Sequence, residues 1–207
     1  LLGRTPLVDE PADCTGVVDE AQLKRVVLAR GAALTPSELS KEVDRIVGAR
    51  EIRATLAAIE AQGAQARYES VAVDDAAALT ATLDRVRQDW GPIAGVVHAA
   101  GVLADRRIAD KTLAQFDLVF GTKVGGLHAL LAATASDPLK LLCVFSSVSA
   151  RCGNTGQGDY AMANEVLAKV VAAEARRRPG LRAKSLGWGP WEGGMVTPAL
   201  KARFAEL

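Results

Sequence analysis

Short apolar segments alternate along the chain with longer segments in which apolar positions recur at helical spacing. The strand candidates are Leu1-Leu2 and residues 69–73, 93–98, 140–145 and 183–188. Several are apolar throughout, which is typical of parallel strands covered on both faces. The helical patterns between them span residues 74–90, 111–135 and 158–178. This alternation predicts a doubly wound, Rossmann-like α/β fold with a parallel sheet.

Residues 6–53 depart from this alternation. The acidic, turn-rich stretch PLVDEPADCTG is followed by two helical patterns, at residues 19–31 and 35–63. The second begins with Thr35 as N-cap, Pro36 at the first helical position and Glu38 completing a capping box. A plain α/β unit needs only one crossover helix here, so we expect residues 6–53 to form a helical insertion on the surface.

Composition narrows the class of protein. With 207 residues, 49% of them hydrophobic, the chain can bury one sizeable core, so a single domain is the simplest expectation. A net charge of +1 and an aromatic content of 4% disfavour nucleic acid and anionic membrane surfaces as partners. No apolar run approaches the ~20 residues that cross a bilayer.

The metal-binding and redox-active residue types are few. The three cysteines, Cys14, Cys143 and Cys152, have neither paired nor metal-ligand spacing, which favours a reducing, cytoplasmic location. His98 and His128 are far apart in the sequence, so we expect no metal site.

The candidate chemistry lies in FSSVSARCGNTGQGDYAMAN, residues 145–164. Ser147 follows a predicted buried strand, and Tyr160 and Asn164 share one face of the next helix. A tyrosine, with a pKa near ~10, acts as an acid or base at neutral pH only when a cation stabilises its anion. Lys123, in the middle of a predicted helix, is the candidate cation. Taken singly, each residue has an ordinary structural explanation, and Lys123 alone fits a solvated surface charge. The set of four predicts a catalytic site.

The spacing of these residues resembles that of short-chain dehydrogenases/reductases, in the ketoreductase form of type I polyketide and fatty-acid synthases. Ser147 precedes Tyr160 by thirteen residues, Asn164 follows Tyr160 by four, and Lys123 precedes Ser147 by twenty-four. Other short-chain dehydrogenases carry Tyr-x-x-x-Lys, whereas synthase ketoreductases exchange the Lys and Asn positions, as here. The resemblance covers nearly the whole chain. It implies that residues 1–207 form the C-terminal major part of a ketoreductase domain, with the insertion after the second strand of the sheet.

Further stretches are similar to the ketoreductases of bacterial polyunsaturated fatty acid synthases. They are GVLADRRIADKTLAQFDLVFGTKVGGL, GNTGQGDYAMANE and WGPWEGGMVTPALKARF. A related polyketide or glycolipid synthase is the alternative.

The resemblance implies NADPH as cofactor. Arg4 in LLGRT would pair with the 2′-phosphate, the planar contact that arginine makes well. The other residues that it places against the cofactor are Thr5, Val73, Ala99, Ala100, Gly101, Lys123, Tyr160, Gly189 and Pro190.

The implied reaction is reduction of a β-ketoacyl thioester carried by an acyl carrier protein, within a multienzyme synthase whose other domains are further partners. Tyr160 would donate the proton and Ser147 would bind the carbonyl oxygen. Lys123 would lower the pKa of the tyrosine and hold the ribose or a proton relay, which Asn164 would position.

Two residues are implied in substrate handling, Asp105 and Trp191. Asp105 is the last residue of a Leu-x-Asp motif that is associated with B-type ketoreductases. Cys152 stands where A-type enzymes carry Trp. Both imply a 3R-hydroxy product, the alternative being that Asp105 is only a loop residue.

The sequence departs from the family pattern in two places. The Gly-rich fingerprint that follows the first strand is not found, so the expected sheet lacks its first strand and its phosphate-binding loop, and we expect weak or no NADPH binding by this segment alone. Ala72 stands where relatives carry an adenine-binding Asp.

Two alternatives to an active ketoreductase remain. One is a non-catalytic structural or docking segment of the synthase, and the other is a free-standing NADP alcohol dehydrogenase. The intact set of four disfavours the first, and the exchanged Lys and Asn disfavour the second.

Overall fold

The computed structural model describes residues 1–31 and 34–191, and these form two compact units. Unit 1 is Leu1–Ala72 and unit 2 continues from Val73. Each unit is described by itself. The boundary at residue 53 that the sequence analysis gave to the insertion falls inside a continuous helix of unit 1.

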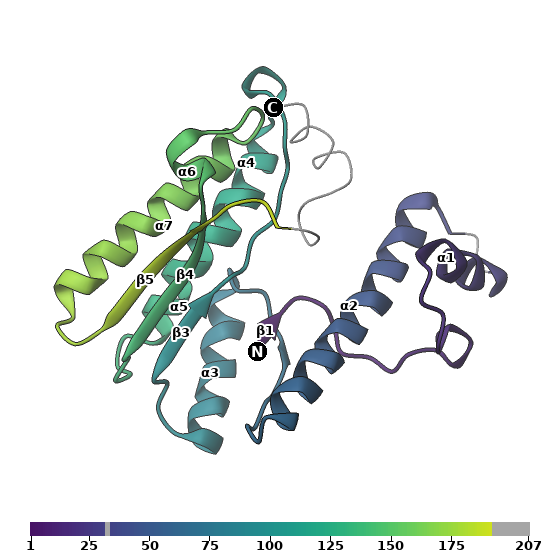
Figure 1. The fold of residues 1–207 in the computed structure, drawn as a ribbon, viewed down its shortest axis with the longest axis horizontal. Coiled ribbons are helices and arrows are strands. Elements are labelled where there is room, and N and C mark those ends of the chain that lie inside the picture. Colours follow the sequence, from purple (N-terminus) through teal and green to yellow (C-terminus); the bar gives the residue numbers. More distant parts are fainter. Residues whose placement is uncertain (32–33, 192–207) are drawn as a thin grey trace. The chain divides into compact units, whose positions relative to one another are not determined.

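Unit 1 contains a two-stranded parallel sheet and a pair of helices (Figure 1). Its elements are β1 (Leu2–Gly3), the 3-10 helix η1 (Ala12–Cys14), α1 (Glu20–Ala29), α2 (Pro36–Ala61) and β2 (Glu69–Ser70). The predicted capping box is confirmed: the Thr35 side chain accepts from the Glu38 amide, and the Glu38 carboxylate accepts from the Thr35 amide. Both helices predicted in the insertion are therefore present.

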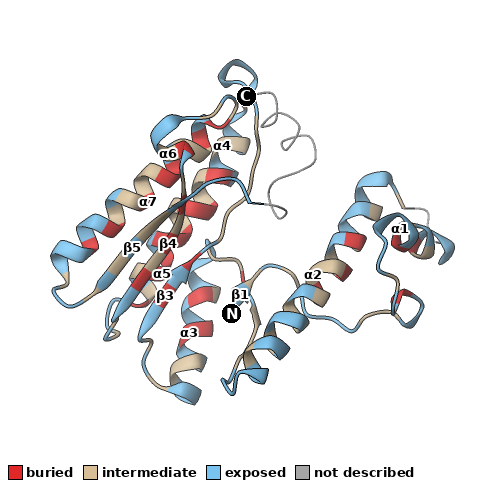
Figure 2. Ribbon diagram, viewed as in Figure 1, coloured by how far each residue is buried: buried red, intermediate tan, exposed pale blue. Residues whose placement is uncertain are grey.

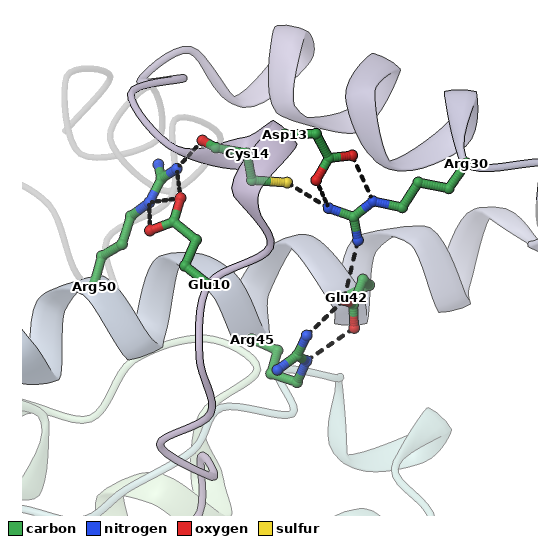
Figure 3. Close-up of polar contacts among 7 residues, drawn as sticks. All are labelled: Glu10, Asp13, Cys14, Arg30, Glu42, Arg45 and Arg50. Atoms are coloured by element: carbon green, nitrogen blue, oxygen red, sulfur yellow. Dashed lines mark hydrogen bonds and ion pairs between the residues drawn. The ribbon is translucent and has the colours of Figure 1, made fainter.

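Paired charges fix the acidic segment before α1 onto these helices (Figure 3). Arg50 of α2 binds Glu10 and donates to the carbonyl oxygens of Cys14 and Val17. The Arg30 guanidinium donates two hydrogen bonds to the carboxylate of Asp13. Beneath them a small apolar core closes the unit: Cys14, Leu23, Val27, Val43 and Ile46. These contacts hold the turn-rich segment in a defined position on α1 and α2.

Unit 2 contains a three-stranded parallel sheet in the order β3-β4-β5. The strands are β3 (Gly95–His98), β4 (Leu141–Ser147) and β5 (Arg182–Trp188). The helical elements are α3 (Ala76–Trp90), η2 (Ile108–Asp110), α4 (Leu113–Phe120), a π-helical segment (Gly121–Gly125), α5 (Gly126–Ala133), α6 (Ser149–Cys152) and α7 (Gly158–Arg177). The strands and long helices predicted for this unit are present, and the α/β prediction is confirmed, whereas the strand predicted at residues 69–73 is only Glu69–Ser70.

The core of unit 2 gathers around the central strand β4 (Figure 2). Leu142 and Val144 of β4 are fully buried. The helices add three leucines that are at most 1% exposed: Leu79 of α3, Leu127 of α5 and Leu167 of α7. β4 pairs with β3 as far as Val144 and with β5 along its whole length, so within the described sheet its carboxyl end is held by β5 alone. That end carries Ser147.

The helical stretch Leu113–Ala133 is 21 residues long with a mean hydropathy of 1.2, so length and composition alone would let it cross a membrane. Core helices share these properties, and α5 contributes Leu127, Ala129 and Leu130 to the core of unit 2. We interpret the stretch as a core helix.

Candidate active site

Ser147 is the last residue of β4, at the sheet edge where α/β folds bind their ligands. Its Oγ accepts hydrogen bonds from the backbone N–H and the hydroxyl of Ser149, at 3.2 and 2.8 Å. Ser149 begins the short helix α6, which the sequence analysis did not predict. Gly153 and Gly156 then turn the chain into α7 with φ values of 70° and 83°. These turns bring α7 back beside the end of β4.

Tyr160 and Asn164 lie one turn apart in α7. Asn164 is fully buried, and its Nδ2 donates to the Tyr160 carbonyl oxygen at 2.8 Å. Its Oδ1 has no hydrogen-bond partner in the part of the chain that the structure describes. Burial raises the pKa of the Tyr160 hydroxyl, and hydrogen bonding with Asn164 and Ser147 opposes that rise. The structure thus brings Ser147, Tyr160 and Asn164 together.

Lys123 lies in the π-helical segment and is only 3% exposed, so the alternative of a solvated surface lysine is wrong. Its Nζ donates to the Phe145 carbonyl oxygen at 3.1 Å and lies 5.3 Å from the centroid of the Tyr160 ring. Desolvation lowers the pKa of Lys123 from its ordinary 10.5 to about 8. The ammonium therefore remains charged at neutral pH, beside the tyrosine that needs a cation.

Two residues at and after the end of β3 shape the surroundings of Lys123. The His98 Nε2 lies 2.8 Å from the Lys123 carbonyl oxygen, and since that oxygen only accepts, Nε2 carries the proton. A Cβ at Gly101 would lie 3.0 Å from the Lys123 Cε, so glycine leaves the room that the lysine side chain occupies. π-helical segments recur at functional sites, and this one turns Lys123 inward.

Asp105 faces the N-terminal end of α7. Its Oδ2 accepts from the Gln157 Nε2 at 2.9 Å, and its charge contributes to the raised pKa of Tyr160. Asp105 is therefore fixed close to Tyr160. Cys152, in contrast, is exposed on α6.

Trp191 follows β5 and packs in an aromatic cluster with Trp188 and Phe145. Its ring meets Trp188 edge-on at 4.7 Å and lies 6.4 Å from Phe145, measured between centroids. Gly189 and Pro190 are exposed beside it. Residues 192–195, which complete the GPWEGGM stretch, lie outside the described residues.

The remaining cofactor candidates are distributed between the two units. Ala99 and Ala100 precede Gly101 in the loop after β3. The Val73 side chain packs toward Gly126, where an added Cβ would meet it at 2.6 Å. In unit 1, the Tyr68 hydroxyl donates to the Thr5 carbonyl oxygen, and Arg4 is exposed with no ion pair among the described residues. The roles of Arg4 and Thr5 stay predictions.

Several residues of this region were missed by the sequence analysis. They are His98, Lys111, Gln157 and Asp159, of which Lys111 and Asp159 form a buried ion pair at 2.6 Å. Gln157 stands three residues before Tyr160, a spacing that could have drawn attention to it. No local signal marks Lys111 and Asp159 as partners. Among residues 1–31 and 34–191 no cluster of metal-ligating side chains occurs.

A Rossmann-like fold that brings a serine, a tyrosine and a buried lysine together beside the end of β4 has the site pattern of short-chain dehydrogenases/reductases. The sequence profile described as KR domain matches residues 20–193. The chain belongs to this family, the ketoreductase domains of polyketide and polyunsaturated fatty acid synthases.

Known relatives agree with this assignment. The large polyunsaturated fatty acid synthase polypeptide of Thraustochytrium sp. is 43% identical over the whole chain, which spans 8% of that protein. An A-type ketoreductase from a modular polyketide synthase is 36% identical with a TM-score of 0.67, covering 78% of this chain and 34% of its own. A short-chain dehydrogenase of Burkholderia cenocepacia, solved in complex with NADP, shares the fold at 21% identity with a TM-score of 0.65, covering 79% and 68%.

Proposed function

We propose that this chain supplies the catalytic side chains for the NADPH-dependent reduction of a β-ketoacyl thioester to the β-hydroxyacyl thioester within a multienzyme synthase, with the substrate on an acyl carrier protein. One observation carries the proposal: the buried Lys123 ammonium lies 5.3 Å from the centroid of the Tyr160 ring. A charged lysine beside a tyrosine is the arrangement that makes tyrosine a usable acid.

The residues present fit a nicotinamide cofactor. The loop Ala99–Gly101 passes over Lys123, and the unpartnered Asn164 Oδ1 leaves an acceptor for a water or a hydroxyl. Lys123 and Tyr160 would hold the ribose side, and Gly189 and Pro190 would flank the nicotinamide. The assignment of Arg4 and Thr5, in unit 1, to the adenosine 2′-phosphate stays a prediction from the sequence. NADPH, when bound, supplies the hydride that the β-carbon receives.

The side chains account for the proton. As the carbonyl carbon gains the hydride, the carbonyl oxygen gains negative charge and takes the Tyr160 hydroxyl proton, while Ser147 donates a hydrogen bond to the same oxygen. The pKa of Tyr160 is raised by burial, which keeps its proton in place before the reaction. The ammonium of Lys123, charged below about pH 8, then stabilises the tyrosinate. Asn164 would position the relay that returns a proton to it.

The stereochemical part of the proposal is a 3R product. It is supported by Asp105, held by Gln157 beside Tyr160, and by Cys152 in place of the tryptophan implied for A-type enzymes. Trp191 would border the substrate. The similarity to an A-type ketoreductase extends to the fold and the family, so the product configuration must be measured.

The test compares NADPH oxidation by the full-length synthase polypeptide that contains this chain and by its Tyr160→Phe variant, with a β-ketoacyl N-acetylcysteamine thioester as substrate. Loss of the proton donor should lower turnover on the order of 10²–10⁴-fold. Thr80→Val, which removes an exposed hydroxyl from α3, is the matched control. Absence of turnover in the folded wild type, including with carrier-bound substrate, would favour the structural or docking alternative.

A further inference from the structure

The loop of residues 102–111, which carries Asp105, is fastened to the segment that leads into α7. The Arg106 backbone N–H donates to the Gly156 carbonyl oxygen at 3.0 Å. Asp105 accepts from the Gln157 side chain at 2.9 Å. The third connection is the ion pair between Lys111 and Asp159 at 2.6 Å. The loop and the start of α7 are thus joined at three points.

The ion pair differs from the other two connections because its partners also bind the backbone of the Asp105 loop and of α7. The Lys111 Nζ donates to Asp159 Oδ2 and also to the Ala104 carbonyl oxygen, at 2.9 Å. The other carboxylate oxygen of Asp159 accepts from the Tyr160 backbone N–H at 2.9 Å. One bridge therefore connects the residue before Asp105 to the backbone of Tyr160.

Burial makes this bridge sensitive to substitution. The side chains of Lys111 and Asp159 are 10% and 2% exposed, whereas the Lys169–Glu165 pair on the same helix is 70% and 30% exposed. Exposed pairs contribute little, but removing one partner of a buried pair leaves an uncompensated charge. In some proteins, buried polar or ionic groups specify geometry although they add little net stability.

We propose that Lys111 and Asp159 are positioning residues that set Asp105 and Gln157 relative to the Tyr160 hydroxyl, and thereby fix which face of the ketone is reduced. The inference rests on the proposed function, since it concerns the same site. Without this bridge, the Asp105 loop would be tied to the start of α7 only through Arg106 and Gln157.

The first test measures the ratio of 3R to 3S product by chiral chromatography for the full-length wild type and for Lys111→Met. A product ratio does not depend on how much enzyme is folded, so a merely structural role would leave it unchanged. We expect the ratio to fall by about tenfold, the effect of losing one charge-assisted hydrogen bond. Lys169→Met, the same change at an exposed pair, should leave the ratio as in the wild type.

A second variant protects the test against misfolding. Lys111→Met combined with Asp159→Asn removes both charges, while the Asn carbonyl oxygen still accepts from the Tyr160 N–H. It should change the product ratio in the same direction. An unchanged ratio in this folded double variant would overturn the proposal.

Amide hydrogen exchange supplies a readout that needs no activity. In either variant the Arg106 amide should exchange about tenfold faster, with no change in β4. If the wild type reduces no β-ketoacyl substrate, the proposed function fails, and exchange alone decides on the bridge: faster exchange at Arg106 supports it, and unchanged exchange contradicts it. Faster exchange with an unchanged product ratio in an active enzyme would reduce Lys111 to a structural role and contradict the proposal.

Discussion

Replacing Lys123 by methionine should stabilise the fold while it abolishes activity. The lysine is 3% exposed and its pKa is lowered from 10.5 to about 8 by desolvation. At 1.36 kcal/mol per pKa unit, holding the ammonium in place costs the folded state about 3 kcal/mol at pH 7. Methionine has similar length and no charge, but it gives up the hydrogen bond to the Phe145 carbonyl oxygen, so we expect a gain of about 1–3 kcal/mol in the free energy of unfolding.

The pH dependence of this gain identifies its cause. A lysine whose pKa is lower in the folded than in the unfolded state destabilises the fold fully below about pH 8, and the penalty disappears as pH rises toward 10.5. The advantage of the methionine variant should therefore shrink by about 2 kcal/mol between pH 7 and pH 10. Titrating groups that do not interact with Lys123 are common to both proteins and cancel in the comparison. The same pair of measurements in a Tyr160→Phe background removes the contribution of the tyrosine that Lys123 faces.

Urea unfolding of the wild type, Lys123→Met and the exposed-site control Lys169→Met, each at pH 7 and pH 10, measures these differences. The control should behave as the wild type does. A Lys123→Met protein that is less stable at pH 7, or that keeps the same advantage at both pH values, would refute the argument that desolvation of the ammonium is the dominant cost.

Two other predictions concern stability. Asp137→Ala removes the buried carboxylate that pairs with Arg87 at 2.7 Å and, among the described residues, leaves Arg87 paired with Asp84 alone. The free energy of unfolding should fall by about 1.5–3 kcal/mol in urea titrations, the loss of a hydrogen bond to a charged group, and an unchanged midpoint would contradict the importance of the pair. The pKa of His98 is lowered by burial, so its contribution to stability is present above pH 6.5 and is lost as pH falls below that value. His98→Gln, which keeps an N–H for the Lys123 carbonyl oxygen, should lose less stability than the wild type between pH 7 and pH 5; equal losses would argue against His98 as the group that titrates.

Much of the fold could be predicted because its signals are local. The capping box at Thr35 marks the start of α2 and is formed in the structure. The apolar runs predict the strands, although the expected burial on both faces is not seen: in β3, Val96 and His98 are buried while Val97 is exposed. The short helix α6 gave no signal because four residues are too few to show helical periodicity.

The candidate site was predicted only as a set of residue types at certain spacings. The burial of Lys123 depends on a π-helical segment and on the space left by Gly101, and neither is visible as a local pattern. The pair Lys111–Asp159 joins residues 48 positions apart, so only the folded chain reveals it. Long-range contacts decide these features, and a single sequence carries no direct record of them.

The most direct test of the central claim is the transfer of deuterium from NADPH labelled at the reactive carbon of the nicotinamide to a β-ketoacyl thioester. We predict that the full-length wild type places the deuterium on carbon 3 of a β-hydroxyacyl product, and that folded Tyr160→Phe gives almost none. A folded wild type that incorporates no deuterium from either a free or a carrier-bound thioester would contradict the assignment of Ser147, Tyr160 and Lys123 to ketone reduction.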